Sequence, residues 1–97
     1  MRIRKFQRLI ERIYYDRDAA RKVERSFRWL VGEAGELVRA LRQRDQTRLW
    51  EEFSDALAWL STLASISGVE LEATVGRYAH AHGCPQCGRA PCGCEGE

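Results

Sequence analysis

Features of several familiar protein classes are missing from this 97-residue sequence. It contains no run of about 20 apolar residues, so no segment is predicted to span a membrane. No stretch shows the alternation of a half-buried β-strand, and no glycine-rich phosphate loop follows a strand. No histidine stands at a useful spacing from Ser54, Ser61 or Ser65, so nucleophilic serine chemistry has no support. These absences favour an all-α fold.

Charged residues are abundant but unevenly placed. The N-terminal segment MRIRKFQRLIERIYY is too charged for a secretory signal, so we expect a soluble, cytoplasmic protein. Residues 1–48 hold 14 Lys and Arg against 7 Asp and Glu, whereas residues 49–97 hold 2 against 7. We interpret the basic half as a field that draws in a triphosphate or as a solvated helix face. We do not expect a nucleic-acid partner.

Apolar periodicity predicts four helices followed by a tail, at about residues 3–15, 18–42, 47–67 and 70–80. Asp18 is the expected N-cap of the second helix, with Arg21 and Lys22 after it. A polar turn over residues 43–46 precedes the third helix, and Gly68 suits its C-cap. We therefore expect a helical-bundle domain over residues 1–82 and a separate tail over residues 83–97.

Four carboxylates on the second and third predicted helices form the pattern ExxE, 15 residues, ExxD: Glu33, Glu36, Glu52 and Asp55. A step of three residues keeps both acids of a pair on nearly the same helix face, so antiparallel packing makes all four converge. Converging carboxylates repel one another, and hard cations with oxygen ligands, Mg²⁺ above all, relieve that repulsion. The pattern therefore predicts a divalent-metal site and, with it, phosphate chemistry.

The alternative is a solvated helix face, because Glu is a good helix former and ExxE is common on helix surfaces. Position favours the metal site. Both pairs lie beside the apolar stripe of their helix, next to Trp29 and Trp59 respectively. Gly32 and Gly35 bracket Glu33 at a cost of about 1 kcal/mol each relative to alanine. This cost indicates that something approaches closely there.

The segment from Trp29 to Gly68, WLVGEAGELVRALRQRDQTRLWEEFSDALAWLSTLASISG, resembles the MazG-like all-α nucleotide pyrophosphohydrolases. The motif of that family is ExxE followed by ExxD, often within E-x-G-E-L and E-E-x-x-D-x-L. Both versions occur here, as EAGEL and EEFSDAL. The resemblance is close over about 40 residues and loose over about 75.

The resemblance implies hydrolysis of nucleoside triphosphates between the α and β phosphates, giving a monophosphate and pyrophosphate. It implies that Glu33, Glu36, Glu52 and Asp55 hold Mg²⁺ or Mn²⁺. Many members have a basic residue in the last helix that contacts phosphate, and Arg77 is the candidate here. Metal ions held by the acids would neutralise phosphate oxygens and acidify a water aligned with the scissile bond. Glu36 or Glu52 is our hypothesis for the general base.

All cysteines of the chain lie in the tail, spaced CxxC, four residues, CxC: Cys84, Cys87, Cys92 and Cys94. In a protein without a secretory signal, this clustering indicates thiolate coordination of Zn²⁺ rather than disulfides. The run CPQCG resembles a zinc knuckle. The ligands are close together in sequence, so His80 or His82 replacing a thiol, or two tails sharing a metal, remain alternatives. A disordered redox-sensitive tail and an iron–sulfur cluster are also open.

A chain this short buries only some 60 to 70% of its unfolded surface, so oligomerisation would help it to fold. Trp29, Trp50 and Trp59 are a heavy aromatic load for 97 residues, and we expect some of them to face another subunit. A homodimer or a dimer of dimers is therefore predicted.

The overall prediction is an all-α, MazG-like helical bundle with a zinc-knuckle-like tail, acting as a Mg²⁺-dependent nucleotide pyrophosphohydrolase. One alternative is a non-catalytic regulatory or adaptor protein on the same fold, which uses the tail to bind a partner. Another is a phosphoribosyl-ATP pyrophosphohydrolase, which shares the fold and differs in substrate. The sequence does not indicate the preferred base or sugar.

Overall fold

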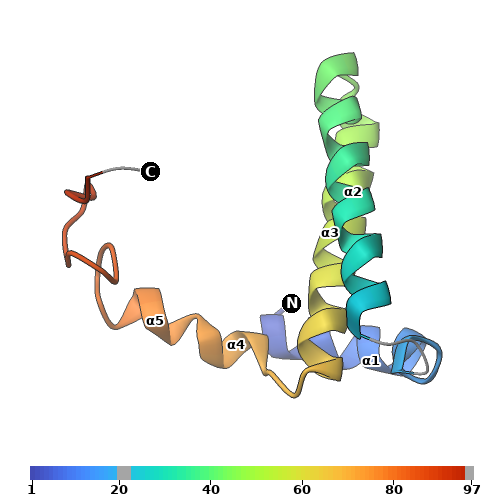
Figure 1. Cartoon of the computed structure of the whole chain (residues 1–97), viewed down its shortest axis with the longest axis horizontal. Coiled ribbons are helices and arrows are strands. Elements are labelled where there is room, and N and C mark those ends of the chain that lie inside the picture. Colours follow the sequence, from blue (N-terminus) through green and yellow to red (C-terminus); the bar gives the residue numbers. More distant parts are fainter. Residues whose placement is uncertain (20–22, 96–97) are drawn as a thin grey trace.

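The computed structural model describes residues 1–19 and 23–95. These residues form helices and no strand, which confirms the all-α expectation. The elements are α1 (Ile3–Ala19), α2 (Val23–Gln43), α3 (Gln46–Ile66), α4 (Leu71–Thr74) and α5 (Gly76–Ala79). The long helices α2 and α3 form an antiparallel hairpin, and α1 crosses its base (Figure 1). The rest of the chain, residues 71–95, extends away from the hairpin as an arm.

The junction between the first two helices differs from the sequence prediction. α1 continues past Tyr15 to Ala19, so Asp18 lies in the last turn of α1 and is not the N-cap of α2. α2 is described from Val23, and the expected first-turn residues 21 and 22 lie outside the described residues. Neither glycine nor proline occurs before Gly32, so the sequence carries no helix-breaking signal at this point.

Both ends of α3 follow from local capping. The Asp45 side chain accepts a hydrogen bond from the backbone N–H of Arg48 at 3.2 Å and so caps the N-terminus. At the other end, the Val69 N–H bonds to the Ala64 carbonyl and the Gly68 N–H to the Ser65 carbonyl. This is a Schellman arrangement, which needs a left-handed residue, and Gly68 supplies it with φ +75°. The predicted glycine cap is confirmed.

The fourth predicted helix is present as two short pieces. α4 and α5 are separated by Val75, which keeps helical backbone angles of φ −58° and ψ −30°. Together they span most of the predicted range of residues 70–80. The tail follows α5, and the domain boundary between residues 82 and 83 stays a prediction. No helix within the described ranges combines the length and apolar composition needed to cross a membrane.

The single chain buries few apolar side chains. Among the described residues, the buried hydrophobic ones are Ile10, Ala40 and Ala64. α2 packs chiefly on α3, and its buried positions are the small residues Ser26 and Ala40. Small residues let two helix backbones come close, because little side-chain volume separates them. The hairpin is therefore held by close contact of small residues rather than by a core of large ones.

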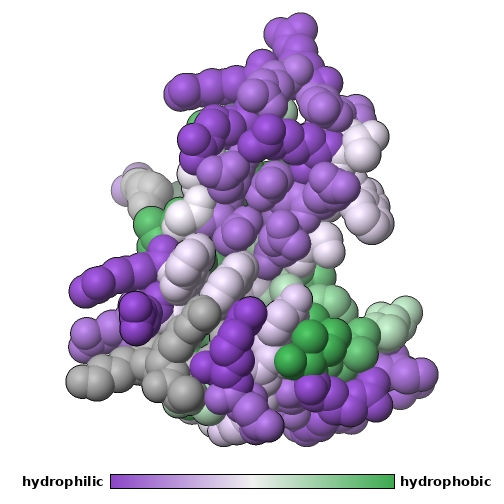
Figure 2. Space-filling view, turned by 90° about the vertical axis from the view of Figure 1, so that its right-hand side faces the viewer, coloured by the Kyte–Doolittle hydropathy of each residue, from purple (hydrophilic) through white to green (hydrophobic). Residues whose placement is uncertain are grey.

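Eight of the exposed large apolar residues of the hairpin lie along one stripe of each helix: Phe27, Val31, Val38 and Leu41 on α2, and Trp50, Phe53, Leu57 and Leu60 on α3. We call these the outer apolar stripes. Their steps of three, four and seven residues place each set on one helix face. Figure 2 shows, on the face in view, that the upper part of the hairpin is hydrophilic and that a hydrophobic patch lies near its base.

Gln7 of α1 is the main polar link between α1, α3 and the start of α4. Its side chain is only 1% exposed. The amide nitrogen donates to Ser65 Oγ at 3.0 Å and to the Val69 carbonyl at 2.9 Å. The amide oxygen accepts from the Leu71 N–H at 2.9 Å. A buried side chain that satisfies backbone groups on two sides fixes where the arm leaves the hairpin.

Replacing this glutamine tests that role. Gln7→Ala should lower the free energy of unfolding by about 1–3 kcal/mol, because it leaves buried backbone groups without partners. Gln43→Ala, which removes an exposed glutamine from α2, is the matched control and should change stability by less than about 0.5 kcal/mol. Urea denaturation of both variants measures the difference, and equal values would contradict the role given to Gln7.

Candidate metal and nucleotide site

The hairpin brings acids from both of its helices together. In an antiparallel pair of helices, residues at about equal distances from the connecting turn lie opposite one another. The turn is at Arg44 and Asp45, so Glu33 of α2 lies at about the same height along the hairpin as Asp55 of α3. Carboxylate oxygens of Glu33, Glu52 and Asp55 all lie within 4.8 Å of one another. Asp55 is exposed, and the two glutamates are half-buried. Three of the four acids singled out in the sequence therefore converge.

Glu33 carries the strongest electrostatic signature of this cluster. Its Oε2 atom is buried and has no hydrogen-bond partner among the described residues. Burial raises the pKa of this carboxyl, and contact with Glu52 and the charge of Asp55 raise it further. Within the described part of the chain, this buried acceptor faces two other acids and has no hydrogen-bonded cation, and a metal ion among the three carboxylates would supply the positive charge.

Glu36 lies outside this trio. Its carboxylate forms an ion pair with Arg39 one turn along α2, and a second with Arg48 of α3 at 3.1 Å. The structure therefore does not bring all four carboxylates together in one cluster. The glycines beside Glu33 do not mark a close approach either, because no atom of the described residues outside the local helix backbone would lie within 4 Å of a Cβ at Gly32 or Gly35.

A pair of tryptophans closes the hairpin beside the acids. The rings of Trp29 on α2 and Trp59 on α3 stack, with centroids 5.9 Å apart and planes only 5° from parallel. Trp29 is one turn before Glu33, and Trp59 is one turn after Asp55. The stack holds the two helices at a set distance on one side of the carboxylates.

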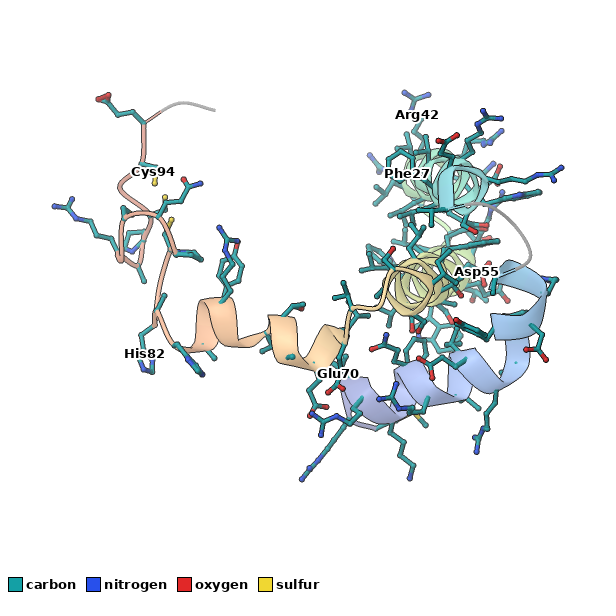
Figure 3. All side chains as sticks on the ribbon, turned by 60° about the horizontal axis from the view of Figure 1, so that its bottom comes forward. Phe27, Arg42, Asp55, Glu70, His82 and Cys94 are labelled. Carbon is teal, nitrogen blue, oxygen red and sulfur yellow. The ribbon has the colours of Figure 1, made fainter. Side chains whose placement is uncertain are left out.

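A small cavity of about 130 Å³ opens beside Asp55 and Trp59. It lies between α1 and α3 and is lined by Tyr14, Arg17, Asp55, Ala58, Trp59 and Thr62. The guanidinium carbon of Arg17 lies 4.6 Å from the centroid of the Tyr14 ring. The cavity thus combines an acid, a cation and aromatic surface. Figure 3 shows Asp55 on the side of α3 that faces α1.

Tyr14 and Arg17 were not predicted as site residues. A signal for them exists, because residues 7, 10, 14 and 17 recur at helical spacing, and the first two of these positions are the buried Gln7 and Ile10. Because the helix was expected to end at residue 15, Arg17 was placed in a connecting segment and was not recognised as part of this helix face.

Arg77, the candidate phosphate contact, is not brought to the acids. It lies on α5, where its guanidinium carbon is 5.5 Å from the centroid of the neighbouring Tyr78 ring. α5 belongs to the arm, which leads away from the hairpin (Figure 1).

The tail holds a second cluster of potential metal ligands. The sulfur atoms of its four cysteines all lie within 4.8 Å of one another. Backbone N–H groups of Gly93 and Arg89 lower the pKa of Cys87 to about 6. Hydrogen bonding with the sulfurs of Cys92, Cys84 and Cys87 favours the protonated thiol of Cys94 and raises its pKa to about 11. His80 and His82 do not belong to this cluster in the described part of the tail.

The two clusters suit different metals. Carboxylate oxygens favour hard cations such as Mg²⁺ and Mn²⁺, whereas thiolates favour Zn²⁺ and other softer ions. The acid cluster adjoins a cavity with a cation and aromatic rings, which are groups that suit a phosphate and a base.

Comparison with known proteins gives a family match that covers the hairpin together with α4 and α5, and so includes Arg77. The model of the MazG nucleotide pyrophosphohydrolase domain matches residues 21–80, a span that contains α2, α3 and all four acids. The match excludes α1 and the cysteine tail. No curated protein and no solved structure gives a significant match. Because the matched span is more than half of the 97 residues, the chain belongs to the MazG nucleotide pyrophosphohydrolase family.

Proposed function

We propose that this protein hydrolyses nucleoside triphosphates to the monophosphate and pyrophosphate, using Mg²⁺ or Mn²⁺ held by Glu33, Glu52 and Asp55. The observation that carries the proposal is the convergence of three carboxylates from two helices, one of them with a buried, unpartnered oxygen. Membership in a family of nucleotide pyrophosphohydrolases supports it. When bound, the cation would supply positive charge against the phosphate oxygens and acidify a water molecule.

Glu36 is the fourth acid of the proposal. To act on a water molecule, its carboxylate has to leave Arg39 and Arg48. A triphosphate is itself an anion that competes for these guanidinium groups, so substrate binding would release Glu36 for a catalytic role. A general base must stay off the metal and within reach of water. Of our two candidates, Glu36 and Glu52, Glu36 fits this requirement better because it lies outside the trio.

Phosphate contact within one chain is assigned to Arg17 rather than Arg77. Arg17 shares a cavity with Asp55, so its charge lies next to the acids that would hold the metal. The Trp59 ring in the same cavity offers a flat apolar surface for a nucleobase. A role for Arg77 would require the arm of one subunit to reach the acids of another.

Association of two copies completes the proposal. The outer apolar stripes leave eight large side chains exposed, Trp50 at 73% and Phe53 at 56% among them. A hollow of about 560 Å³ near the turn is lined by Leu49, Trp50 and Phe53 together with Gln46 and Thr47, none of them charged. A second hairpin laid against these stripes gives a four-helix bundle, which is the predicted homodimer or the core of a dimer of dimers.

Substitution of single acids tests the site. Glu33→Gln and Asp55→Asn should each lower pyrophosphate release at least about 100-fold, because each removes one metal ligand. Glu51→Gln is the matched control, since Glu51 is an exposed acid next to Glu52 and outside the cluster. The assay screens canonical and damaged NTPs and dNTPs with Mg²⁺. Absence of release from every substrate would favour the regulatory or adaptor alternative.

The raised pKa of Glu33 predicts how stability depends on pH. A carboxyl whose pKa is raised by folding supports the folded state at low pH, and this support is lost as the pH rises through the folded pKa. Glu33→Gln should therefore raise the melting temperature of the chelator-treated protein at about pH 8. The gain should vanish below the ordinary pKa of 4.5, where Glu33 is protonated in both states. A gain that persists at low pH would contradict this cause.

Sedimentation tests the assembly. We expect the wild type to sediment as a dimer or tetramer at micromolar concentration, and Phe53→Glu to shift it toward monomer, because a charge in an apolar interface is costly. Ser54→Glu places the same charge at the next position of α3, which is not part of the outer apolar stripes, and should leave the assembly intact. A monomeric wild type would rule out the bundle.

A further inference from the structure

We propose that the tail is a closed, mononuclear zinc site in which Cys84, Cys87, Cys92 and Cys94 of one chain supply all four ligands. The family match ends before the tail, and the proposed hydrolysis makes no use of these residues. The inference therefore goes beyond the proposed function. It rests on the positions of the sulfur atoms and of the backbone around them.

The sulfur positions match the size of one tetrahedral zinc ion. Zinc–sulfur bonds of about 2.3 Å in tetrahedral geometry place neighbouring sulfurs about 3.8 Å apart. The sulfurs of Cys84 and Cys94 are 3.7 Å apart, and those of Cys87 and Cys92 are 4.0 Å apart. All four lie within 4.8 Å of one another. A disulfide would need about 2.05 Å, and all four cysteines are free.

Backbone groups around the sulfurs are arranged to favour thiolates. The Gly93 N–H donates to the Cys87 sulfur and the Cys94 N–H to the Cys92 sulfur, both at 3.3 Å. Hydrogen bonds of this kind stabilise the charged form of a ligand and hold it in place. Backbone N–H groups of Cys87 and Gln86 likewise favour the thiolate of Cys84, so both cysteine pairs receive such contacts.

The chain from Cys84 to Arg89 forms a tightly closed loop. The Cys84 N–H donates to the Arg89 carbonyl at 3.0 Å, and the Gly88 N–H donates to the Cys84 carbonyl at 2.7 Å. Gly88 has φ +75°, a conformation that other residues adopt at a cost. A Cβ at Gly83 would lie 2.9 Å from the Arg89 carbonyl oxygen, so the close return of the chain requires glycine there. The ligand positions are therefore set by the backbone.

This geometry separates the alternatives left open by the sequence. A complete set of four sulfurs within one tail makes sharing between two tails unnecessary. Figure 3 shows His82 near the start of the tail, well apart from Cys94. A multi-iron cluster binds its cysteines to separate iron atoms, so their sulfurs would have to lie farther apart than around one ion. One ion bound by four thiolates is the arrangement that remains. Zinc is the ion that we assign to it, because closed tetrahedral four-thiolate sites with a structural role typically hold zinc.

The tail has a physical need for such an ion. Among the described residues, no buried hydrophobic side chain lies beyond Ala64. Residues 80–95 therefore have no apolar core to offset the entropy lost on ordering them. Metal–thiolate bonds can replace a core in segments of this size, because binding free energy then becomes folding free energy. A closed four-ligand site keeps no position for substrate, so its role is structural.

Metal content of the full chain tests the proposal directly. The wild type purified without chelator should hold about one zinc ion per chain, and Co²⁺ exchanged into it should give the absorption of tetrahedral thiolate coordination. The double variant Cys84→Ser with Cys87→Ser should lose the ion. The double variant His80→Ala with His82→Ala should keep it. Iron in place of zinc, half an ion per chain, or equal loss from the histidine variant would overturn the assignment.

Proteolysis reports on the fold of the tail without reference to activity. The Arg89 carbonyl is bonded to the Cys84 N–H, so trypsin cannot cleave after Arg89 until this loop opens. Cleavage there should be slow in the zinc-loaded wild type and at least about tenfold faster in the cysteine variant, as measured by mass spectrometry of the fragments. Equal rates would show that the ion does not order the tail.

Loss of the zinc site in the tail should not affect the proposed Mg²⁺ site of the hairpin. The cysteine variant should retain helical circular dichroism and Mg²⁺-dependent pyrophosphate release, because no tail cysteine belongs to the acid cluster. Loss of release with intact helicity would contradict a structural role confined to the tail. If the wild type shows no hydrolysis at all, the zinc content and the cleavage rate still decide the present proposal.

Discussion

The close antiparallel contact between α2 and α3 determines the position of each acid in the site. Its buried positions on α2 are Ser26 and Ala40, which are small enough for the two backbones to approach. This approach brings Glu33 within reach of Glu52 and Asp55 and lets Trp29 stack on Trp59. A hairpin separated by large side chains would hold the same acids too far apart for a single cation.

The acid cluster opposes folding in the metal-free chain. Three carboxylates within 4.8 Å repel one another, and burial adds to the cost of ionising Glu33. Attractive contacts nearby oppose this cost, among them the tryptophan stack and the pairing of Glu36 with two arginines. Such an arrangement is poor for stability alone and suits a cation that completes it, which links the energetics of the hairpin to the proposed function.

The exposed apolar stripes and the cysteine tail reflect the same limit of a short chain. Three buried hydrophobic residues among those described are a small core for a protein of this length. We infer that the hairpin meets this limit by packing against a second copy, and the tail by binding a metal. The two solutions use different chemistry, apolar contact in one case and thiolate coordination in the other, so each region can be ordered independently of the other.

The sequence by itself determined the helical class, the glycine cap at the C-terminus of α3, the acids and the cysteines, because these depend on periodicity and on local residue chemistry. It did not determine where α1 ends, since residues 16–19 carry no breaking signal and helix continuation there is a matter of small differences in free energy. Only the tertiary structure decided that Glu36 pairs with Arg39 and Arg48 instead of joining the other acids. It likewise decided that Arg17 rather than Arg77 lies beside Asp55, and that the four cysteine sulfurs lie close enough together for one ion. These outcomes depend on how far apart side chains from different segments come to lie, and a linear pattern does not encode such distances.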